Sequence, residues 1–573
     1  MMLLGDPLSR SSRDWAKLLI ATIIVVALTA FLIWALAPVH SSRMADWPWI
    51  LWSSISYTWE WGQYIIDGKG IHDLRQLEWL PFAHGIVTIS GFLISATLIA
   101  TTSALSYMRS DYGDSRYATA HDVRKMKLDG KMGPVLGQFR RQMLMQSSPR
   151  SILVLAPTRA GKTRGLVIPT LLTYPGTMVV MDPKQELLQK TADAQRAMGR
   201  RVEVLDWANP DSPSGWNPLG ADLPQNNVDL ERALERQAAM IFADKGGGEA
   251  SAYFRDNGRR NYVAFAMFEV LEARRQGREP NLADVAGHIG KFQIEEDGEI
   301  ESDALGTMLK TIARTAMVHG YPERISSDLL VLAQQAPKPR GEHINTFLTG
   351  VQLWRNLSVR QVTSRSSFRF ADLRKEPTTV YLPFPQSDAK AFGPLTAIFL
   401  ESLFAWTLDH EQQPGEHPIL IVGEEWASLP KIPLVFDALA KGNGMGLHLM
   451  IVLQDLSQFK ELYQDTGVDQ LFTNCTYVVA FNQPKTLEQK RLSETVGQTT
   501  RRRKSVNKND EKLFGSSSMS FEGVPLIRPE QWGQIPFGRH VLLAQSHFTT
   551  PIFCKTPFWD QNPKLRKLMN RTS

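Results

Sequence analysis

Two kinds of hydrophobic patterning divide this chain. Residues 18–37 form an uncharged apolar run, and residues 81–105 form a second one in which His84 is the only ionisable side chain. A helix of about 20 residues is roughly 30 Å long, which matches the hydrocarbon thickness of a bilayer. The pattern predicts two membrane-spanning helices joined by an external loop over residues 38–80.

Each run has an alternative interpretation. The first could be a signal peptide, because Ala35 and Ala37 resemble a cleavage site, although the apolar stretch is longer than usual for one. The second could be a buried helix of a soluble domain. Basic residues cluster before the first run and after the second one: Arg10, Arg13, Lys17, Arg109, Arg116, Arg124, Lys125, Lys127 and Lys131. Since basic residues stay on the cytoplasmic side, we expect residues 1–108 to be a two-span anchor with both chain ends in the cytoplasm.

From residue 151 onward, short apolar runs bounded by turn residues indicate buried strands. These runs cover 151–156, 177–182, 201–205, 379–382, 419–422, 449–453, 477–480 and 540–543. Between 228 and 350 the apolar residues instead recur at helical spacing. The pattern predicts an α/β domain with a parallel central sheet over 109–227 and 351–573, interrupted by an all-α domain over 228–350. Residues 498–520 are polar and are expected to form a solvated loop.

Composition changes this picture in only two places. The mean hydropathy of −0.21 excludes a polytopic transporter, and two cysteines in 573 residues exclude a disulfide framework. The net charge of +6 permits nucleic acid or anionic lipid as a partner but requires neither.

The clearest chemical motif is the octapeptide at residues 156–163, APTRAGKT. It fits the phosphate-loop pattern GxxxxGK[ST] except that Ala156 stands at the first glycine, and it lies between a predicted strand and a helix. In such a loop backbone amides hold phosphates, the lysine reaches the β- and γ-phosphates, and the hydroxyl binds Mg²⁺. The candidate nucleotide-binding residues are Pro157, Thr158, Arg159, Ala160, Gly161, Lys162 and Thr163.

Hydrolysis also needs carboxylates at strand ends, and two groups compete for this role. Glu424 and Glu425 follow the strand 419–422, and an adjacent pair can place one carboxylate on metal and one on water. We therefore prefer Glu424 and Glu425 as the pair that carries out hydrolysis, with one carboxylate facing the metal and one facing water. Asp182, Lys184 and Glu186, after another strand, are assigned as a supporting cluster.

Two further features have open interpretations. Gln454 follows the strand 449–453, and it is either a catalytic sensor of the γ-phosphate or an ordinary polar residue at a strand end. The basic run 501–504 is either a solvated loop or a DNA contact.

Several segments resemble the coupling proteins of type IV secretion systems. The similarity spans nearly the whole chain and is carried by residues 112–119, 156–172, 182–186 (DPKQE for the family's DPKGE), 216–219 (WNPL), 424–429 (EEWASL for DEFANL), 442–446 and 453–458. Two departures from the family bear on mechanism: Glu424 replaces its Asp, and Ala156 replaces the first glycine of its phosphate loop. The resemblance implies that Glu424 orients Mg²⁺ and that Glu425 polarises the attacking water.

The resemblance implies a RecA-like domain that forms a hexameric ring, with ATP and Mg²⁺ as cofactors. It also implies a bacterial inner-membrane location with two spans, contact with membrane lipids, and inner-membrane components of the secretion channel as partners. The expected cargo is a relaxase-bound single-stranded DNA, an effector protein, or both. Two alternatives remain: a nucleotide-gated substrate receptor with little hydrolysis, and a double-stranded DNA translocase of the chromosome-segregation type.

Overall fold

The computed structural model describes Thr97 and residues 112–146, 148–243, 249–287, 289, 303–383, 388–507 and 516–571. The chain divides into two compact units, Met1–Asp111 and Tyr112–Ser573. Apart from Thr97, the described residues do not include the predicted membrane anchor: the spans 18–37 and 81–105 and the loop 38–80. The membrane anchor over residues 1–108 therefore stays a prediction.

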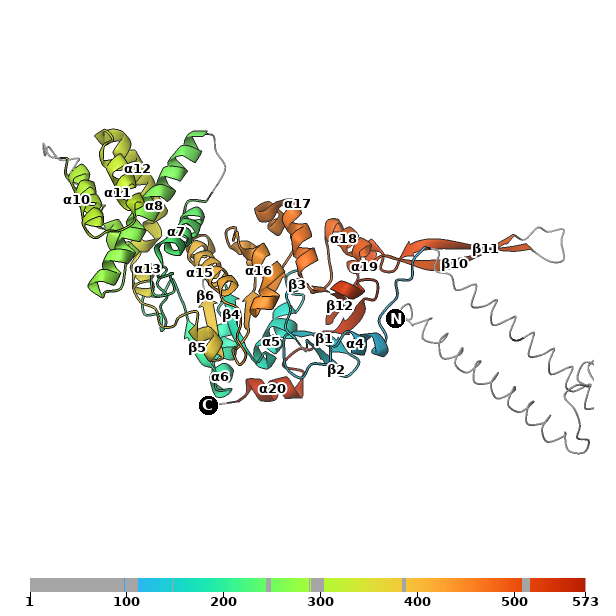
Figure 1. Cartoon of the computed structure of the whole chain (residues 1–573). Coiled ribbons are helices and arrows are strands. Elements are labelled where there is room, and N and C mark those ends of the chain that lie inside the picture. The colour runs from blue at the N-terminus through green and yellow to red at the C-terminus, as the bar shows by residue number, and fades with distance from the viewer. Residues whose placement is uncertain are drawn as a thin grey trace, which may run out of the picture. The chain divides into compact units, whose positions relative to one another are not determined.

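The second unit is built on an eleven-stranded sheet (Figure 1). Its strand order is β2-β1-β13-β12-β9-β3-β8-β7-β4-β6-β5. The strands are β1 (Val135–Phe139), β2 (Gln142–Met145), β3 (Ile152–Leu155), β4 (Thr177–Asp182), β5 (Arg201–Val204), β6 (Thr378–Pro383), β7 (Ile419–Gly423), β8 (Leu447–Leu453), β9 (Tyr477–Ala480), β12 (Arg539–Ala544) and β13 (Ile552–Lys555).

The prediction of a parallel central sheet is confirmed only in part. The strands from β9 to β5 pair in parallel, whereas β12 pairs antiparallel with β9, and β13, β1 and β2 continue the antiparallel pairing. The connection between β12 and β13 is too short for the crossover that parallel strands require. The fold is thus α/β with a mixed sheet.

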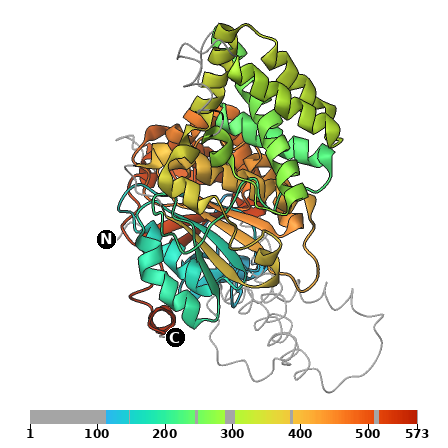
Figure 2. The same cartoon turned by 90° about the vertical axis from the view of Figure 1, so that its left-hand side faces the viewer.

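Both faces of the sheet are covered, because successive residues of each central strand point to opposite sides. In β3, Ile152 and Val154 belong to one core, and Leu153 and Leu155 belong to the other. Helices α5 (Ile168–Thr173), α6 (Glu186–Ala197) and α20 (Pro563–Met569) cover the first face. Helices α15 (Ala389–Asp409), α16 (Val435–Lys441), α17 (Leu456–Asn474) and α18 (Thr486–Val496) cover the second (Figure 2).

A group of helices lies between β5 and β6 in sequence. It contains α7 (Asn227–Ile241), α8 (Glu249–Gln276), α10 (Ala304–Val318), α11 (Glu323–Ala333), α12 (Pro337–Gly350), η4 (Gln352–Arg355) and α13 (Leu357–Val362). Helix α8 contacts α7, α11 and α12, and α7 packs on α15. These helices occupy the range that was expected to be all-α. The boundaries of a separate all-α domain at residues 228 and 350 stay a prediction. Shorter elements are α4 (Ala120–Lys125), η3 (Thr163–Val167), α14 (Asp372–Lys375), η6 (Trp426–Ser428), η7 (Gly442–Met445), α19 (Pro529–Trp532) and η8 (Gln545–His547).

The prediction of a solvated loop over residues 498–520 is wrong for the residues that the structure describes. Here β10 (Gln498–Asn507) and β11 (Ser516–Pro525) form a two-stranded antiparallel hairpin that projects from the sheet domain (Figure 1). Its base is tied to the start of the unit, since the Tyr112 N–H donates to Thr500 Oγ1 at 3.2 Å. The hairpin residues whose burial is described are exposed or partly buried. A ribbon without a buried face needs no apolar alternation, and its sequence therefore resembled a loop.

Helix α15 is the one described helix that is long and apolar enough to cross a membrane, over Ala391–Asp409. Most of this stretch is buried within the protein, against the sheet and the neighbouring helices. Its apolar character therefore has a sufficient explanation in the core of the α/β unit.

A buried carboxyl in α15 makes stability depend on pH. Glu401 is 3% exposed, and burial raises its pKa from 4.5 to about 7, although it accepts the Leu434 N–H at 3.1 Å. Between these two pH values the unfolded chain loses the proton first, so Glu401 lowers stability as the pH rises. We expect Glu401→Gln to stabilise the protein by up to about 3 kcal/mol above pH 7 and by little near pH 4.5.

Urea unfolding of residues 112–573 at pH 5 and pH 8 measures this difference. A stabilisation of equal size at both pH values would contradict the ionisation argument, because a packing effect does not depend on pH.

Candidate nucleotide-binding site

Four adjacent parallel strands deliver the predicted residues to one edge of the sheet. In the order β3-β8-β7-β4, their carboxyl ends are in register, with Leu155 opposite Leu453 and Met181 opposite Gly423. The phosphate-loop motif follows β3, Gln454 follows β8, the two glutamates follow β7, and Asp182 ends β4. In open α/β sheets ligands bind in the crevice at this edge.

The phosphate-loop motif forms a tight turn into a helix. The Ala156 N–H donates to the Leu453 carbonyl at 3.0 Å, which ties the start of the loop to β8. Arg159 and Gly161 have positive φ values of 62° and 87°, and η3 begins at Thr163. The positive end of the helical segment and the free amides of its first turn thus face the loop, as phosphate binding requires.

The last part of the chain packs against this loop, which sequence reasoning missed. A Cβ atom on Gly161 would lie 2.9 Å from Phe558 Cε1, and one on Gly165 would lie 2.1 Å from Thr556 Cγ2. Glycine is therefore required at both positions by close approach of the C-terminal segment. The sequence held only a weak signal, the turn-forming Pro536 to Gly538 around an aromatic residue.

Glu424 and Thr163 contact each other directly. The Thr163 hydroxyl donates to Glu424 Oε1 at 2.5 Å. Glu424 is 7% exposed, and burial raises its pKa to about 7, against the lowering effects of the Thr163 hydrogen bond and Lys162. The two residues assigned to Mg²⁺ in sequence analysis are thus adjacent in the structure.

Glu425 lies beside a different set of groups. Gln454 Nε2 donates to Glu425 Oε1 at 3.0 Å, and Lys184 Nζ lies 3.5 Å from the same oxygen. Glu425 has a φ of 55°, a left-handed conformation that costs a non-glycine residue about 1 kcal/mol. This turn of the backbone lets consecutive glutamates point to different partners.

Lys162 stands among charges of both signs. Burial lowers its pKa, Glu424 and Glu425 oppose that shift, and Lys184 adds to it. A partly desolvated lysine next to carboxylates is placed to bind phosphate oxygens as a point charge.

The supporting cluster is only partly assembled. Asp182 is fully buried and its Oδ2 accepts the Leu188 N–H at 2.7 Å, which anchors the start of α6. Glu186 pairs with Lys190 on the same helix at 2.5 Å and does not contact Glu424 or Glu425 in the described hydrogen bonds and ion pairs. Gln185 has a φ of 56°, which explains why glycine suits this position in similar sequences.

The oxygen atoms present suit a divalent cation. Asp182 Oδ1 is buried and has no hydrogen-bond partner among the described residues. Hydroxyl and carboxylate oxygens are the ligands Mg²⁺ prefers, usually one or two from protein with the rest from phosphate and water. Within the described residues no group of three or more His, Cys, Asp or Glu side chains is arranged for a metal ion. The Thr163 hydroxyl and the Glu424 carboxylate, which lie in contact, fit a metal that also binds phosphate oxygens.

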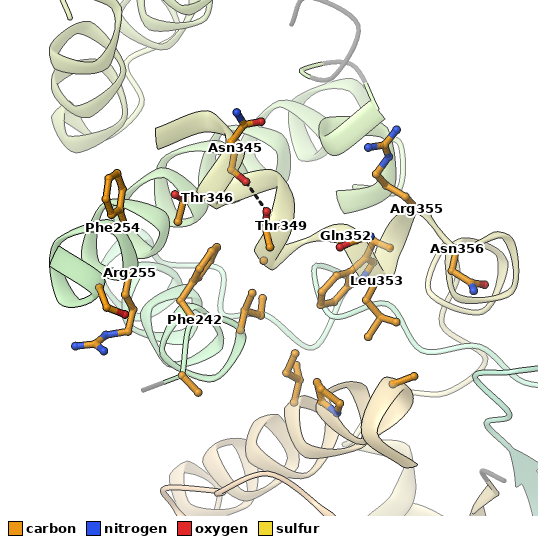
Figure 3. Close-up of a pocket in the computed structure, with 18 residues that line it drawn as sticks. Phe242, Phe254, Arg255, Asn345, Thr346, Thr349, Gln352, Leu353, Arg355 and Asn356 are labelled. Atoms are coloured by element: carbon orange, nitrogen blue, oxygen red, sulfur yellow. Dashed lines mark hydrogen bonds between the residues drawn. The ribbon is translucent and has the colours of Figure 1, made fainter. Parts of the chain in front are cut away.

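A cavity of about 1260 Å³ lies elsewhere, between α7, α8, α12 and η4 on one side and α15 on the other (Figure 3). Phe242, Phe254, Arg255 and Asn345 are among its lining residues, and none of them comes from the strand ends described above. It is thus separate from the phosphate loop.

Comparison with known proteins extends over nearly the whole described unit. Residues 110–572 match the family described as "Type IV secretory system Conjugative DNA transfer". The chain is 26% identical to "Protein VirD4" of Agrobacterium fabrum over 475 residues, which covers 79% of this chain and 67% of that protein. It is 23% identical to "Conjugal transfer protein TraG" of Escherichia coli over 526 residues, covering 85% and 79%.

Solved structures share the fold. The "Bacterial conjugative coupling protein TrwBdeltaN70" superposes with a TM-score of 0.56 at 16% identity, covering 78% of this chain and 93% of that one. "Plasmid coupling protein TrwB in complex with ADP and Mg2+" gives a TM-score of 0.53 at 16% identity, covering 78% and 97%.

Proposed function

This chain belongs to the family of type IV secretion coupling proteins, and we propose that it is a membrane-anchored ATPase that delivers DNA or protein into a type IV secretion channel. The observation that carries the proposal is the meeting of Lys162, Thr163, Glu424, Glu425 and Gln454 at the carboxyl edge of four adjacent strands.

The phosphate loop binds the triphosphate of ATP. The amides of the loop and of the first turn of η3 donate to phosphate oxygens, and Lys162 offsets their charge. TrwB was solved with ADP and Mg²⁺ and with an ATP analogue, which supports the same ligands here. Thr163 and Glu424 would hold Mg²⁺, which when bound supplies positive charge to the phosphate oxygens.

Glu425 acts as the general base. Its carboxylate accepts a proton from the attacking water, and Gln454 and Lys184, which both contact Oε1, hold that carboxylate in one orientation. Gln454 then also lies beside the position where the γ-phosphate is expected. Asp182 supports the site by fixing α6, and Lys184 supports it by contact with Glu425.

Glu424 in place of aspartate places the carboxylate one methylene further from the backbone. The 2.5 Å contact with Thr163 indicates that the longer side chain still reaches the hydroxyl that the metal would share. The substitution is therefore compatible with hydrolysis.

The partners follow from the family. We propose a bacterial inner-membrane location through two N-terminal spans, a hexameric ring, contact with secretion-channel components, and relaxase-bound single-stranded DNA or effector proteins as cargo. The relative described as "Conjugal transfer protein TraG" supports a role in conjugal transfer. Two alternatives compete with the motor: a nucleotide-gated receptor with little hydrolysis, and a double-stranded DNA translocase.

ATPase measurements on residues 109–573, with and without single-stranded DNA, test the proposal. We expect turnover that depends on Glu425 and rises with single-stranded DNA. ATP binding without turnover would support the receptor instead, and stimulation by double-stranded DNA alone would support the translocase.

A further inference from the structure

An exposed aromatic ring stands beside the phosphate loop. Phe537, in the turn before β12, is 68% exposed, which is unusual for a phenylalanine. It stacks on Phe558, which is 6% exposed, with ring centroids 5.4 Å apart and an interplanar angle of 23°. One face of Phe537 is therefore supported by a buried ring, while much of its surface remains open to solvent.

Contacts to the phosphate loop fix the location of this pair. A Cβ on Gly161 would lie 2.9 Å from Phe558 and 3.5 Å from Phe537. The Arg164 guanidinium lies over the Phe558 ring, 4.6 Å from its centroid, and Arg164 Nε donates to Asp560 Oδ1 at 2.7 Å. The Trp559 N–H donates to the Arg164 carbonyl at 3.2 Å. The rings thus lie along the first turn after the loop.

This location is where the rest of a bound nucleotide must go. The loop and the first turn of η3 take the phosphates, with the β- and γ-phosphates at Lys162 and Thr163. Since the γ-phosphate is expected near Glu424 and Glu425, we expect the ribose and base to continue from the α-phosphate on the other side, toward the turn that holds Arg164. An aromatic face beside that turn offers a base a surface for stacking.

We propose that Phe537, supported by Phe558, binds the nucleobase of the nucleotide by stacking. This inference rests on the proposed function and assigns the base subsite of the same site. Phe537 supplies the contact surface, while Arg164 and Asp560 are positioning residues that keep Phe558 in place. Because every base has a π-face, stacking by itself discriminates weakly between adenine and guanine.

Binding of two ligands by the full chain tests the subsite: ATP, and inorganic tripolyphosphate, which has phosphates but no base. Stacking contributes about 1–3 kcal/mol per base, so we expect Phe537→Ala to weaken ATP binding by about 5- to 150-fold. Tripolyphosphate binding should change less than twofold. Phe537→Trp should restore ATP binding, and Tyr253→Ala, which removes an exposed aromatic on α8, should change neither affinity.

Three results would overturn the proposal. ATP binding that is unaffected by Phe537→Ala would remove the stacking contact. An equal loss of affinity for ATP and for tripolyphosphate in Phe537→Ala would mean that Phe537 only supports the phosphate loop. A change in oligomeric state with unchanged ATP affinity would assign the exposed ring to a contact between subunits. Failure of the proposed function has a different signature: neither ligand would bind the unmodified protein in a Lys162-dependent way.

Discussion

Replacing Lys162 by alanine is expected to weaken ATP binding by about 100-fold or more and to abolish turnover. Lys162 is partly desolvated and lies in the field of Glu424 and Glu425. Without it, a triphosphate would approach these carboxylates without the lysine that lies in their field. A like-charge pair about 5 Å apart costs ~3 kcal/mol at an effective dielectric constant of 20, which corresponds to about two orders of magnitude in affinity.

Isothermal titration with ATP and Mg²⁺ measures the first effect, and phosphate release measures the second. Lys190→Ala is the matched control, because Lys190 is an exposed lysine of α6 that pairs with Glu186 by i,i+4 spacing. It should leave both values unchanged, since exposed pairs of this kind contribute little. ATP affinity in Lys162→Ala equal to that of the unmodified protein would contradict nucleotide binding at this loop.

Replacing Glu425 by glutamine is expected to reduce turnover by about 100- to 10,000-fold, the usual contribution of a general base, while ATP still binds. Glutamine keeps the shape of the side chain and an oxygen for the 3.0 Å hydrogen bond from Gln454, but it cannot accept a proton from water. The ion pair with Lys184 at 3.5 Å is also lost. Removal of a negative charge from the phosphate site should leave ATP affinity equal or higher.

Single-turnover hydrolysis and ATP titration separate these two effects. Glu235→Gln, at an exposed carboxylate of α7 that pairs with Arg324, is the control for the same chemical change and should have no effect on either. Turnover that persists in Glu425→Gln would exclude Glu425 as the base. Loss of ATP binding in this variant would show instead that Glu425 holds the loop together.

The two variants together distinguish a motor from a receptor. A motor requires loss of cargo delivery in both, because hydrolysis fails in each of them. A nucleotide-gated receptor requires delivery to fail in Lys162→Ala but to persist in Glu425→Gln, which still binds ATP. Cargo delivery in cells, measured as transfer frequency, therefore distinguishes the two functions once ATP affinity and turnover are known for both variants.

Much of the sheet could be predicted because its strands are continuous apolar runs. β4 and β9 have the predicted limits, and β7 and β8 extend the predicted runs by one or two residues. A strand buried on both faces must be apolar throughout, and the sequence displays this directly. By contrast, β1, β2 and β13 have partly buried or exposed positions, and the described side chains of the β10–β11 hairpin include no buried one, so none of these strands left such a pattern.

The site was predictable in its parts for a related reason. Each candidate follows a strand, and parallel strands bring their carboxyl ends to one edge. That pattern does not indicate which strands are neighbours in the sheet. β3 and β4 are consecutive along the chain, yet β8 and β7 lie between them in the sheet. That insertion brings Gln454 to Glu425 and Glu424 to Thr163.

The sequence by itself determined the elements and the chemical groups: buried strands, a phosphate loop, paired glutamates and a long helical segment. It did so because secondary structure and motif chemistry depend on neighbours within a few residues. Only the tertiary structure decided the mixed sheet, the order of its central strands, the separate partners of Glu424 and Glu425, and the rings of Phe537 and Phe558 beside Gly161. These features depend on contacts between residues that are tens to hundreds of positions apart, which no local pattern encodes.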